Sequence, residues 1–336
     1  MKKPLLAIFI IGLYLLPISA MADTSLYGEL RYSLNSVDED RINGIDGLSG
    51  QDNISLFGLK GSYGEHIKTF FHLQTQAFAD DPNKDTRGFQ QRFFMGGIEG
   101  NFGKVTYGRM TNAYKFSGFA MDPFYNLSHI NAAGAYAVGG ATYGLSGATN
   151  GFTDNAFQYV TPNLNGVKLT GGFYVDDGNE NDHGYLAGVS YSGVKGLDMG
   201  GTFATNGNTA STIPNIAPGG DAYRLYGTYK MDQFKIGVSY ENVAINSTRD
   251  ANFLYIVGTM TMDSTDISLS VGSVGEGAAE GIGVNAGAFY TIAENTKIFG
   301  LVSWASLDDS PIVGGQDSAP RVISLGTMHK FGLSAK

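Results

Sequence analysis

Polar and apolar residues alternate along most of this chain, and this period of two limits its possible folds more than any other feature. In residues 67–78, IKTFFHLQTQAF, the apolar Phe71 and Leu73 share one parity, whereas His72 and Gln74 share the other. A β-strand places successive side chains on opposite faces, so such a stretch has one apolar face and one polar face. The alternation recurs at 167–175, 224–231 and 234–241. The pattern predicts an all-β protein.

The connections between the alternating stretches are of two kinds that take turns along the chain. Short turn sequences lie at 62–66, 101–104, 162–168, 192–198, 230–235, 261–265 and 291–297. Longer polar connections lie near 36–52, 79–88, 111–150, 176–184, 206–221, 246–252, 275–283 and 307–320. This order predicts about sixteen antiparallel strands, with every long loop at one end. A water-soluble sandwich has no reason for such asymmetry, whereas a transmembrane barrel has short turns on one side and long loops on the other.

Residues 1–22 have the layout of a secretory signal. The segment begins with two lysines, continues through an apolar run from Leu5 to Leu16 and ends in Ala-Met-Ala at Ala22. We expect cleavage there and a single β-barrel domain over residues 23–336. The alternative is an N-terminal membrane anchor, but the run is short for a spanning helix. No later apolar run is long enough to span a bilayer as a helix, which argues against a helical membrane protein.

A closed sheet explains how a strand-rich chain can cross a bilayer. In hydrocarbon every backbone N–H and C=O group needs a partner, and a closed barrel leaves no open edge. The apolar parity then faces lipid and the polar parity faces a lumen, which at about sixteen strands is wide enough to hold water.

Composition excludes several other classes. The chain has no Cys, which rules out a disulfide scaffold, and it has 48 Gly, 19 Tyr and 21 Phe, a bias that suits strands and turns. The formal net charge of −9 makes nucleic acid an unlikely partner. Only 5 His are present, with no close pair at metal-ligand spacing, so no metal and no cofactor are expected.

Five segments in order resemble the general (trimeric) porins of Gram-negative outer membranes. They are SLYGELRYSL at 25, LFGLKGSYG at 56, RFFMGGIEGNFGKVTYGRM at 92, DNAFQYVTPNLNGVKLTGGFYV at 154 and SLGTMHKF at 324. The resemblance covers essentially the whole chain after the signal. It implies a 16-stranded antiparallel transmembrane β-barrel with an inward-folded third loop, located in the outer membrane. It also implies a homotrimer in contact with outer-membrane lipid and lipopolysaccharide that passes small hydrophilic solutes and ions without catalysis.

One departure from the family stands at the end of the chain. Porins of this kind usually stop at a terminal Phe that the assembly machinery is thought to read, whereas GLSAK follows Phe331 here. We expect this tail to form a small extension on the periplasmic side. Assembly efficiency, and not the fold, is what the departure puts in question.

The resemblance also implies a pore constriction. In the family the third loop narrows the barrel and carries acidic residues that face basic residues of the wall. Compared residue by residue, Arg92 resembles a wall arginine of the family and Arg109 resembles the arginine at the entry to the loop. Lys60 resembles a lumen lysine of the second strand, and Asp122 resembles the loop acid. The alternative for each charge is a solvated residue with no special role.

Two departures weaken the basic side of this constriction. Leu56 stands where such porins have a further arginine, and Glu29 stands where the first strand often has a lysine. Arg31 and Lys68 share lumen-facing parities and can compensate. Together with the net acidity, this predicts a mild cation preference.

Two other functions remain as alternatives. A substrate-specific outer-membrane channel for a sugar or another small solute would need a file of aromatic or basic residues in the lumen. A barrel enzyme would need a Ser, a His and an orienting group together, and no GxSxG elbow occurs.

Overall fold

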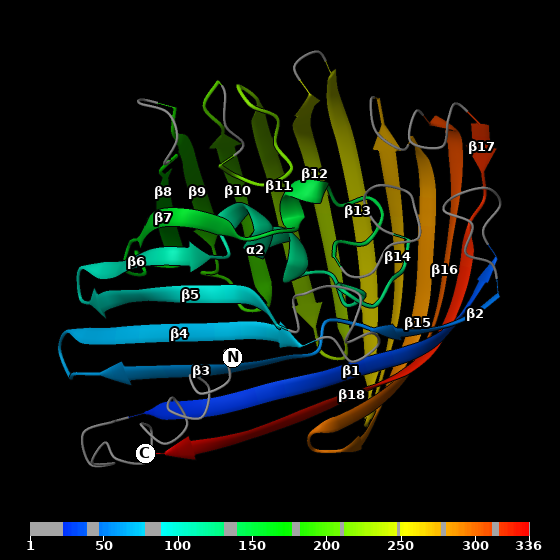
Figure 1. Ribbon diagram of the computed structural model, residues 1–336, viewed down its shortest axis with the longest axis horizontal. Helices are drawn as coiled ribbons and strands as arrows, with labels where there is room; N and C mark the ends of the chain where they lie inside the picture. Colours follow the sequence, from blue (N-terminus) through cyan, green and yellow to red (C-terminus); the bar gives the residue numbers. More distant parts are fainter. Residues whose placement is uncertain are drawn as a thin grey trace, which may run out of the picture.

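The computed structural model describes residues 23–38, 47–77, 89–130, 140–176, 182–208, 212–246, 249–276, 280–310 and 316–335. The expected signal at 1–22 lies outside these residues. Within them the chain forms one antiparallel sheet, and Figure 1 shows its strands side by side around a barrel. The strands are β1 (Thr24–Asp38), β2 (Gly47–Asp52), β3 (Leu56–Tyr63), β4 (Lys68–Ala77), β5 (Phe89–Gly100), β6 (Gly103–Met110), β7 (Thr153–Val160), β8 (Val167–Tyr174), β9 (Gly184–Tyr191), β10 (Leu197–Thr205), β11 (Asp221–Met231), β12 (Phe234–Asn246), β13 (Arg249–Met262), β14 (Thr265–Gly275), β15 (Gly281–Ala293), β16 (Thr296–Ser310), β17 (Gln316–Ser318) and β18 (Arg321–Ala335).

The sheet closes on itself through its first and last strands. Strand β1 pairs with β18 along its whole length, from Thr24 opposite Ala335 to Asp38 opposite Arg321. Strands β2 and β3 both pair with β1, one after the other, so they are two parts of one strand. Strands β17 and β18 pair with β16 in the same way. The 18 strands therefore make 16 spanning strands, and the predicted fold is confirmed.

The two ends of the barrel differ as predicted. Each of the seven short turn sequences connects two neighbouring strands: β3 to β4, β5 to β6, β7 to β8, β9 to β10, β11 to β12, β13 to β14 and β15 to β16. Figure 1 shows the described part of the connection between β10 and β11 at the opposite end of these strands. The longest connection between described strands joins β6 to β7 and contains α2 (Ala113–Phe119) and η2 (Gly147–Thr149).

Several loop boundaries were wrong. Residues 47–52, expected in a loop, form β2 and pair with residues 32–37 of β1. Strand residues also occupy parts of the expected loops at 246–252 and 307–320. The physical reason is that backbone pairing continues beyond the hydrocarbon layer, where a strand no longer needs apolar side chains on its outer face. Alternating hydrophobicity marks only the part of a strand that lipid surrounds.

The two faces of the sheet carry the predicted polarity. Along β12, Phe234, Ile236 and Val238 are exposed on the outside, whereas Ser239 and Glu241 are buried. Strand β4 follows the same rule: His72 contacts Tyr27, and Gln74 donates to the Tyr27 hydroxyl at 2.8 Å, which places this polar parity inside the barrel. The described residues contain no helix with the length and apolar character needed to cross a bilayer.

The C-terminal tail is part of the wall. Phe331 lies opposite Gly28, and Gly332 to Ala335 continue the pairing with β1 down to Thr24. The expected short extension is therefore a continuation of the closing strand, because β1 begins four residues before Gly28 and provides it with a partner.

Candidate pore constriction

A short helix begins the long connection between β6 and β7. Asn112 caps α2 by accepting a hydrogen bond from the backbone N–H of Lys115 at 2.8 Å, and its amide nitrogen donates to Thr153 Oγ1 at 2.9 Å. The backbone N–H of Ala113 donates to Gln158 Oε1 at 3.1 Å. These bonds satisfy N–H groups at the helix start that have no partner within the helix. They also attach the start of the helix to Thr153 and Gln158 of β7.

A buried ion pair holds α2 against the inner wall. Arg224 of β11 and Glu241 of β12 are direct cross-strand partners, their charged groups lie 2.8 Å apart, and both side chains are 0% exposed. Arg224 donates to the carbonyl oxygen of Tyr114 and, at 3.1 Å, to Ser117 Oγ. The pair therefore binds the helix at two points.

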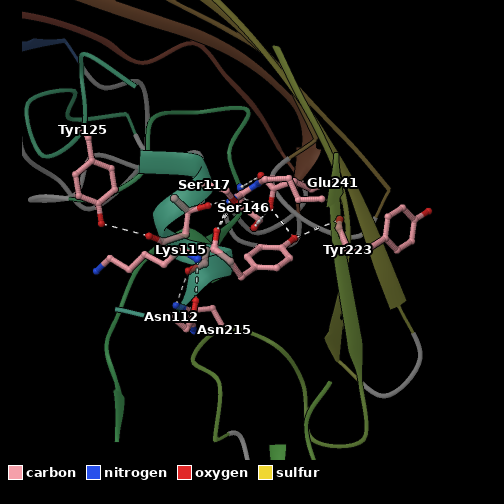
Figure 2. A network of polar contacts seen from close by, with 12 residues as sticks. Asn112, Lys115, Ser117, Tyr125, Ser146, Asn215, Tyr223 and Glu241 are labelled. Carbon is pink, nitrogen blue, oxygen red and sulfur yellow. Dashed lines mark hydrogen bonds and ion pairs between the residues drawn. The ribbon is translucent and has the colours of Figure 1, made fainter. Parts of the chain in front are cut away.

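The same ion pair also binds the later part of the connection, as Figure 2 shows for Ser146 and Glu241. Glu241 accepts from the Ser146 backbone N–H at 3.0 Å, from the Ser146 hydroxyl, and from the Tyr114 hydroxyl at 2.9 Å. Arg224 donates to Thr149 Oγ1. Each charge has hydrogen-bond partners beyond the other charge, which a buried pair needs to offset its loss of hydration. We call Arg224 and Glu241 the anchor pair.

The middle of the connection is fixed to other strands. Asp122 accepts from the Phe124 backbone N–H at 2.9 Å, the Thr142 backbone N–H at 3.1 Å and the Tyr255 hydroxyl of β13 at 2.9 Å. Burial raises its pKa, against the lowering effect of these bonds. Asp122 is 6% exposed, and its carboxylate is engaged with two backbone N–H groups of the loop and with one wall residue, Tyr255.

Further contacts extend the connection across the lumen. Ser128 donates to Asn285 of β15 at 2.8 Å, and the rings of Phe124 and Phe289 lie 6.1 Å apart. At Gly272 of β14 the loop approaches the wall so closely that a Cβ would lie 1.9 Å from the Tyr143 carbonyl oxygen. Because residues within 112–130 and 140–149 bond to β11, β12, β13 and β15 on their inner faces, these two described segments lie inside the barrel.

Three cations surround one aromatic ring where the loop returns to the wall. The centroid of the Phe152 ring lies 4.1 Å from Lys115 Nζ, 4.8 Å from Arg92 Cζ and 5.3 Å from Arg109 Cζ. These distances are typical of cation–π contacts. Lys115 also donates to the Gly151 carbonyl oxygen at 2.8 Å. We call Arg92, Arg109, Lys115 and Phe152 the basic cluster.

A β-bulge helps direct Arg92 into the lumen. Gln74 of β4 lies opposite Phe93 and Thr75 lies opposite Gln91, so the register skips Arg92. A bulge changes the direction of a side chain relative to strict alternation, and here Arg92 and Phe93 line the same cavity. The Arg92 Nε donates to Gln74 Oε1 at 2.9 Å, which orients the guanidinium.

The basic cluster lies between two cavities. A cavity of about 480 Å³ is lined in part by Arg31, Arg92, Lys115, Asp122 and Phe152. A second cavity, of about 350 Å³, is lined in part by Arg92, Arg109, Lys115 and Phe152. Both cavities are lined by Arg92, Lys115 and Phe152, so a solute in either cavity contacts this cluster.

The remaining predicted site residues occupy different positions. Glu29 accepts from Arg31 at 2.9 Å, so the acid and the base that the sequence placed in the lumen neutralise each other. Lys60 Nζ lies 5.4 Å from the Tyr27 ring centroid. Lys68 is exposed at the turn end of β4, opposite Glu99 in the register. The structure thus brings Arg92, Arg109 and Arg31 to the cavities, and leaves Lys60 and Lys68 nearer the turns.

Sequence reasoning missed Lys115, Phe152 and the anchor pair. Arg224 and Glu241 lie on the polar parity of stretches whose alternation was recognised, so a strongly charged residue at mid-strand was an available signal. Asn112 is a helix-capping residue three positions before Lys115, which is a start signal for a helix inside the loop. Nothing in the sequence near Phe152 indicates that three cations meet there.

Several charges at the cavities are paired, and the exceptions among the described residues are Arg92, Lys115 and Asp122. Arg109 donates to Asp154 at 2.7 Å, and Lys297 donates to Asp266 at 3.1 Å. Arg92 and Lys115 have no carboxylate partner among the described residues. Burial, followed by the charges of Arg92 and Arg109, lowers the pKa of Lys115 to about 7. No cluster of three or more potential metal-ligating His, Asp or Glu side chains occurs in the described part of the chain.

Comparisons with known proteins agree with this architecture. The family model described as Gram-negative porin matches residues 8–310. The major outer membrane protein P.IB of Neisseria meningitidis serogroup B is 24% identical over 281 residues, which cover 78% of this chain and 80% of that protein. P.IB of Neisseria sicca is 30% identical over 131 residues, covering 37% of this chain and 35% of that protein.

Solved structures share the fold at low sequence identity. The anion-selective porin from Comamonas acidovorans has a TM-score of 0.69 and 18% identity, and the match covers 92% of this chain and all of that one. OmpF of Salmonella typhi, in complex with daunomycin, has a TM-score of 0.70 and 15% identity, with 92% and 97% covered.

Proposed function

This chain belongs to the family of Gram-negative porins, which are outer-membrane channels and not enzymes, and on that premise we propose that it is a passive diffusion pore for ions and small hydrophilic solutes, narrowed by residues 111–130 and 140–152. The observation that carries the proposal is the loop segment bound to the inner wall of a closed barrel, with cavities of about 480 and 350 Å³ that are both lined by residues of the basic cluster. A solute crossing the barrel meets polar and charged side chains at this level. No energy source or bound cofactor is needed for such passage.

We infer that the constriction favours anions. Among the described residues that line the two cavities, the bases without an ion-pair partner are Arg92 and Lys115, and the acid without one is Asp122. The carboxylate of Asp122 accepts three hydrogen bonds and is nearly buried, so its field in the passage is weak. Charges that line a narrow, poorly hydrated passage act strongly on a passing ion, because low-dielectric walls focus the field. Loop charges more than a Debye length away, about 8 Å at physiological salt, are largely screened.

The competing prediction is the mild cation preference that follows from the net charge of −9 and from Glu29 and Leu56. It treats the whole chain as one acidic surface. Two observations support a preference for anions instead. The 2.9 Å bond between Glu29 and Arg31 neutralises one lumen acid, and Lys115 adds a base on the loop itself.

The test is the single-channel conductance and zero-current potential of the purified protein in a planar bilayer under a KCl gradient. Large ohmic steps with an anion-signed potential are expected. A cation-signed potential would keep the channel and restore the prediction from net charge. A small conductance that one neutral sugar blocks saturably would favour the substrate-specific alternative. An absence of conductance from a folded barrel would overturn the diffusion function.

We also propose that the barrel forms a homotrimer embedded in outer-membrane lipid and lipopolysaccharide. The support is the resemblance to trimeric porins and the apolar outer face, where Leu30, Leu34 and Leu325 are among the side chains left exposed by a single chain. The measurement is the mass of the protein extracted in mild detergent, before and after heating. A mass of one chain under all conditions would refute the trimer.

A further inference from the structure

We propose that the lumen contains a binding track for small aromatic carboxylates, in which the ring of the solute stacks on wall aromatics while its carboxylate pairs with the basic cluster. The inference rests on the proposed diffusion function and narrows it to a preferred class of solute. It goes beyond anion preference, because chloride and acetate would gain only from the charges.

The track is a continuous file of rings on the inner face. The Phe93 ring packs edge-on against Phe152 at 5.1 Å, and the His72 ring stacks on Phe93 at 4.5 Å with an interplanar angle of 27°. The Tyr27 ring follows at 5.8 Å from His72. These four rings come from β1, β4, β5 and the end of the long loop, so tertiary structure assembles the file. None of them is fully buried, so their faces remain partly open to the lumen.

Cations stand at both ends of the file. Arg92, Arg109 and Lys115 surround the Phe152 end, and Lys60 lies 5.4 Å from the Tyr27 ring at the other. An anion leaving the cluster towards the turn side therefore moves along aromatic surface to a second positive charge. This alternation suits a solute that carries both a ring and a carboxylate.

The Phe152 end has free hydrogen-bonding capacity for a carboxylate. The hydrogen bond that the described residues give Arg92 uses Nε, so its two terminal nitrogens remain for a bidentate contact. Lys115 is 4% exposed, and a desolvated ammonium interacts more strongly with an anion than one in water does. Phe93 and Phe152 line the same cavity as these two bases.

The cavity volume agrees with this class of solute. A volume of about 480 Å³ lies within the range of small-molecule sites, and the lining combines aromatic rings with many polar and charged groups, in which bases outnumber the acids Asp122 and Asp266. Offset or edge-on contacts between aromatic rings contribute beyond simple burial. A saturated ring of the same charge and similar size would lose that contribution, which supplies a matched pair of probes.

The experiment compares benzoate with cyclohexanecarboxylate as blockers of the KCl current through single channels. From the usual strength of ring–ring contacts, benzoate should reach half-block at an about 2- to 10-fold lower concentration. Acetate, tested alongside, should block least. Equal half-block concentrations for benzoate and cyclohexanecarboxylate would overturn the track.

Variants locate the effect. Phe93→Leu should bring the two half-block concentrations to within about twofold of each other. Phe94→Leu is the matched control, because Phe94 is 61% exposed on the outer face and should leave the ratio as in the parent. If Phe93→Leu does not fold, Phe152→Leu tests the same file from the loop side. An unchanged ratio in whichever of these variants folds would refute the assignment of the rings.

The outcomes separate the two proposals. The KCl conductance recorded before any benzoate is added tests the diffusion function. Normal conductance without discrimination between the two acids would refute the track alone, whereas a folded barrel without KCl conductance would refute both.

Discussion

Removing the charge of Glu241 should release the loop from the wall. In Glu241→Gln the shape of the side chain is kept, but the Arg224 guanidinium, 0% exposed, loses its counter-ion at 2.8 Å. Breaking a buried pair by removing one partner costs about 3–5 kcal/mol, because a buried charge is left uncompensated. The barrel strands are held by their own ladders, so we expect most of this cost to fall on the attachment of α2 and residues 146–149 to the wall. That corresponds to roughly a 100- to 1000-fold increase in the unseated population.

The chain has no Cys, so one engineered thiol can report this opening. Ala148→Cys places the thiol in η2 at a position that is 1% exposed. Its rate of reaction with a water-soluble maleimide, measured in detergent, should rise by about two orders of magnitude when Glu241→Gln is added. Single-channel records of the Glu241 variant should show noisier open states.

A matched control tests the reasoning. Glu99→Gln removes a carboxylate that lies 3.7 Å from Lys104 and is 43% exposed, so it should change the labelling rate by less than about fivefold. Adding Arg224→Met to Glu241→Gln removes the unpaired charge and should restore part of the protection. Labelling of the Glu241 variant at the parent rate would show that the anchor pair does not hold the loop.

Four further predictions concern the constriction and the seam. Arg92→Ser should widen the passage and shift the zero-current potential towards cations, and an unchanged potential would remove this residue from the constriction. Because the pKa of Lys115 is lowered to about 7, its charge is present below that pH and lost above it, so anion preference should fall between pH 6 and pH 8 and lose most of that dependence in Lys115→Gln. Gly272→Ala should displace the loop and change the conductance, since its Cβ would meet a loop carbonyl oxygen, whereas Gly275→Ala, which meets nothing within 4 Å, should not. Deletion of residues 332–336 removes backbone hydrogen bonds to β1, each worth roughly 0.5–1.5 kcal/mol, and should lower the free energy of unfolding of the barrel by about 2 kcal/mol. If the truncated barrel resists heating on gels as well as the parent does, this prediction is wrong.

The barrel could be predicted from the sequence because lipid imposes a strict rule on every strand. Each outward position must be apolar, and the sequence records that rule as a period of two, with turns between the strands. The rule ends where the hydrocarbon ends, and for that reason the pairing of residues 47–52 and of the C-terminal tail was missed.

The constriction was predicted only in part, since it depends on contacts between distant segments. Arg92 and Arg109 lie on the wall, where local pattern and resemblance place them. The positions of Lys115 and Phe152 depend on how the loop is attached to the wall. That attachment is made by the anchor pair on β11 and β12 and by the bond between Asp122 and Tyr255 of β13. The bulge at Arg92 comes from a shift in the register between β4 and β5, and no local residue pattern predicts that shift.

The closing seam has a consequence for how the barrel can form. Strand β1 finds its second partner in β18, and the contact between Ser25 and Ser334 joins residues 309 positions apart. Forming this pairing costs the entropy of closing a loop that contains almost the whole chain, so it should be among the last to form. Until then β1 and β18 are open edges with unpaired N–H and C=O groups, and each can join the edge of another chain. The unfinished barrel is therefore the species most prone to aggregate, and a factor that covers either edge strand during export would raise the yield of closed barrels.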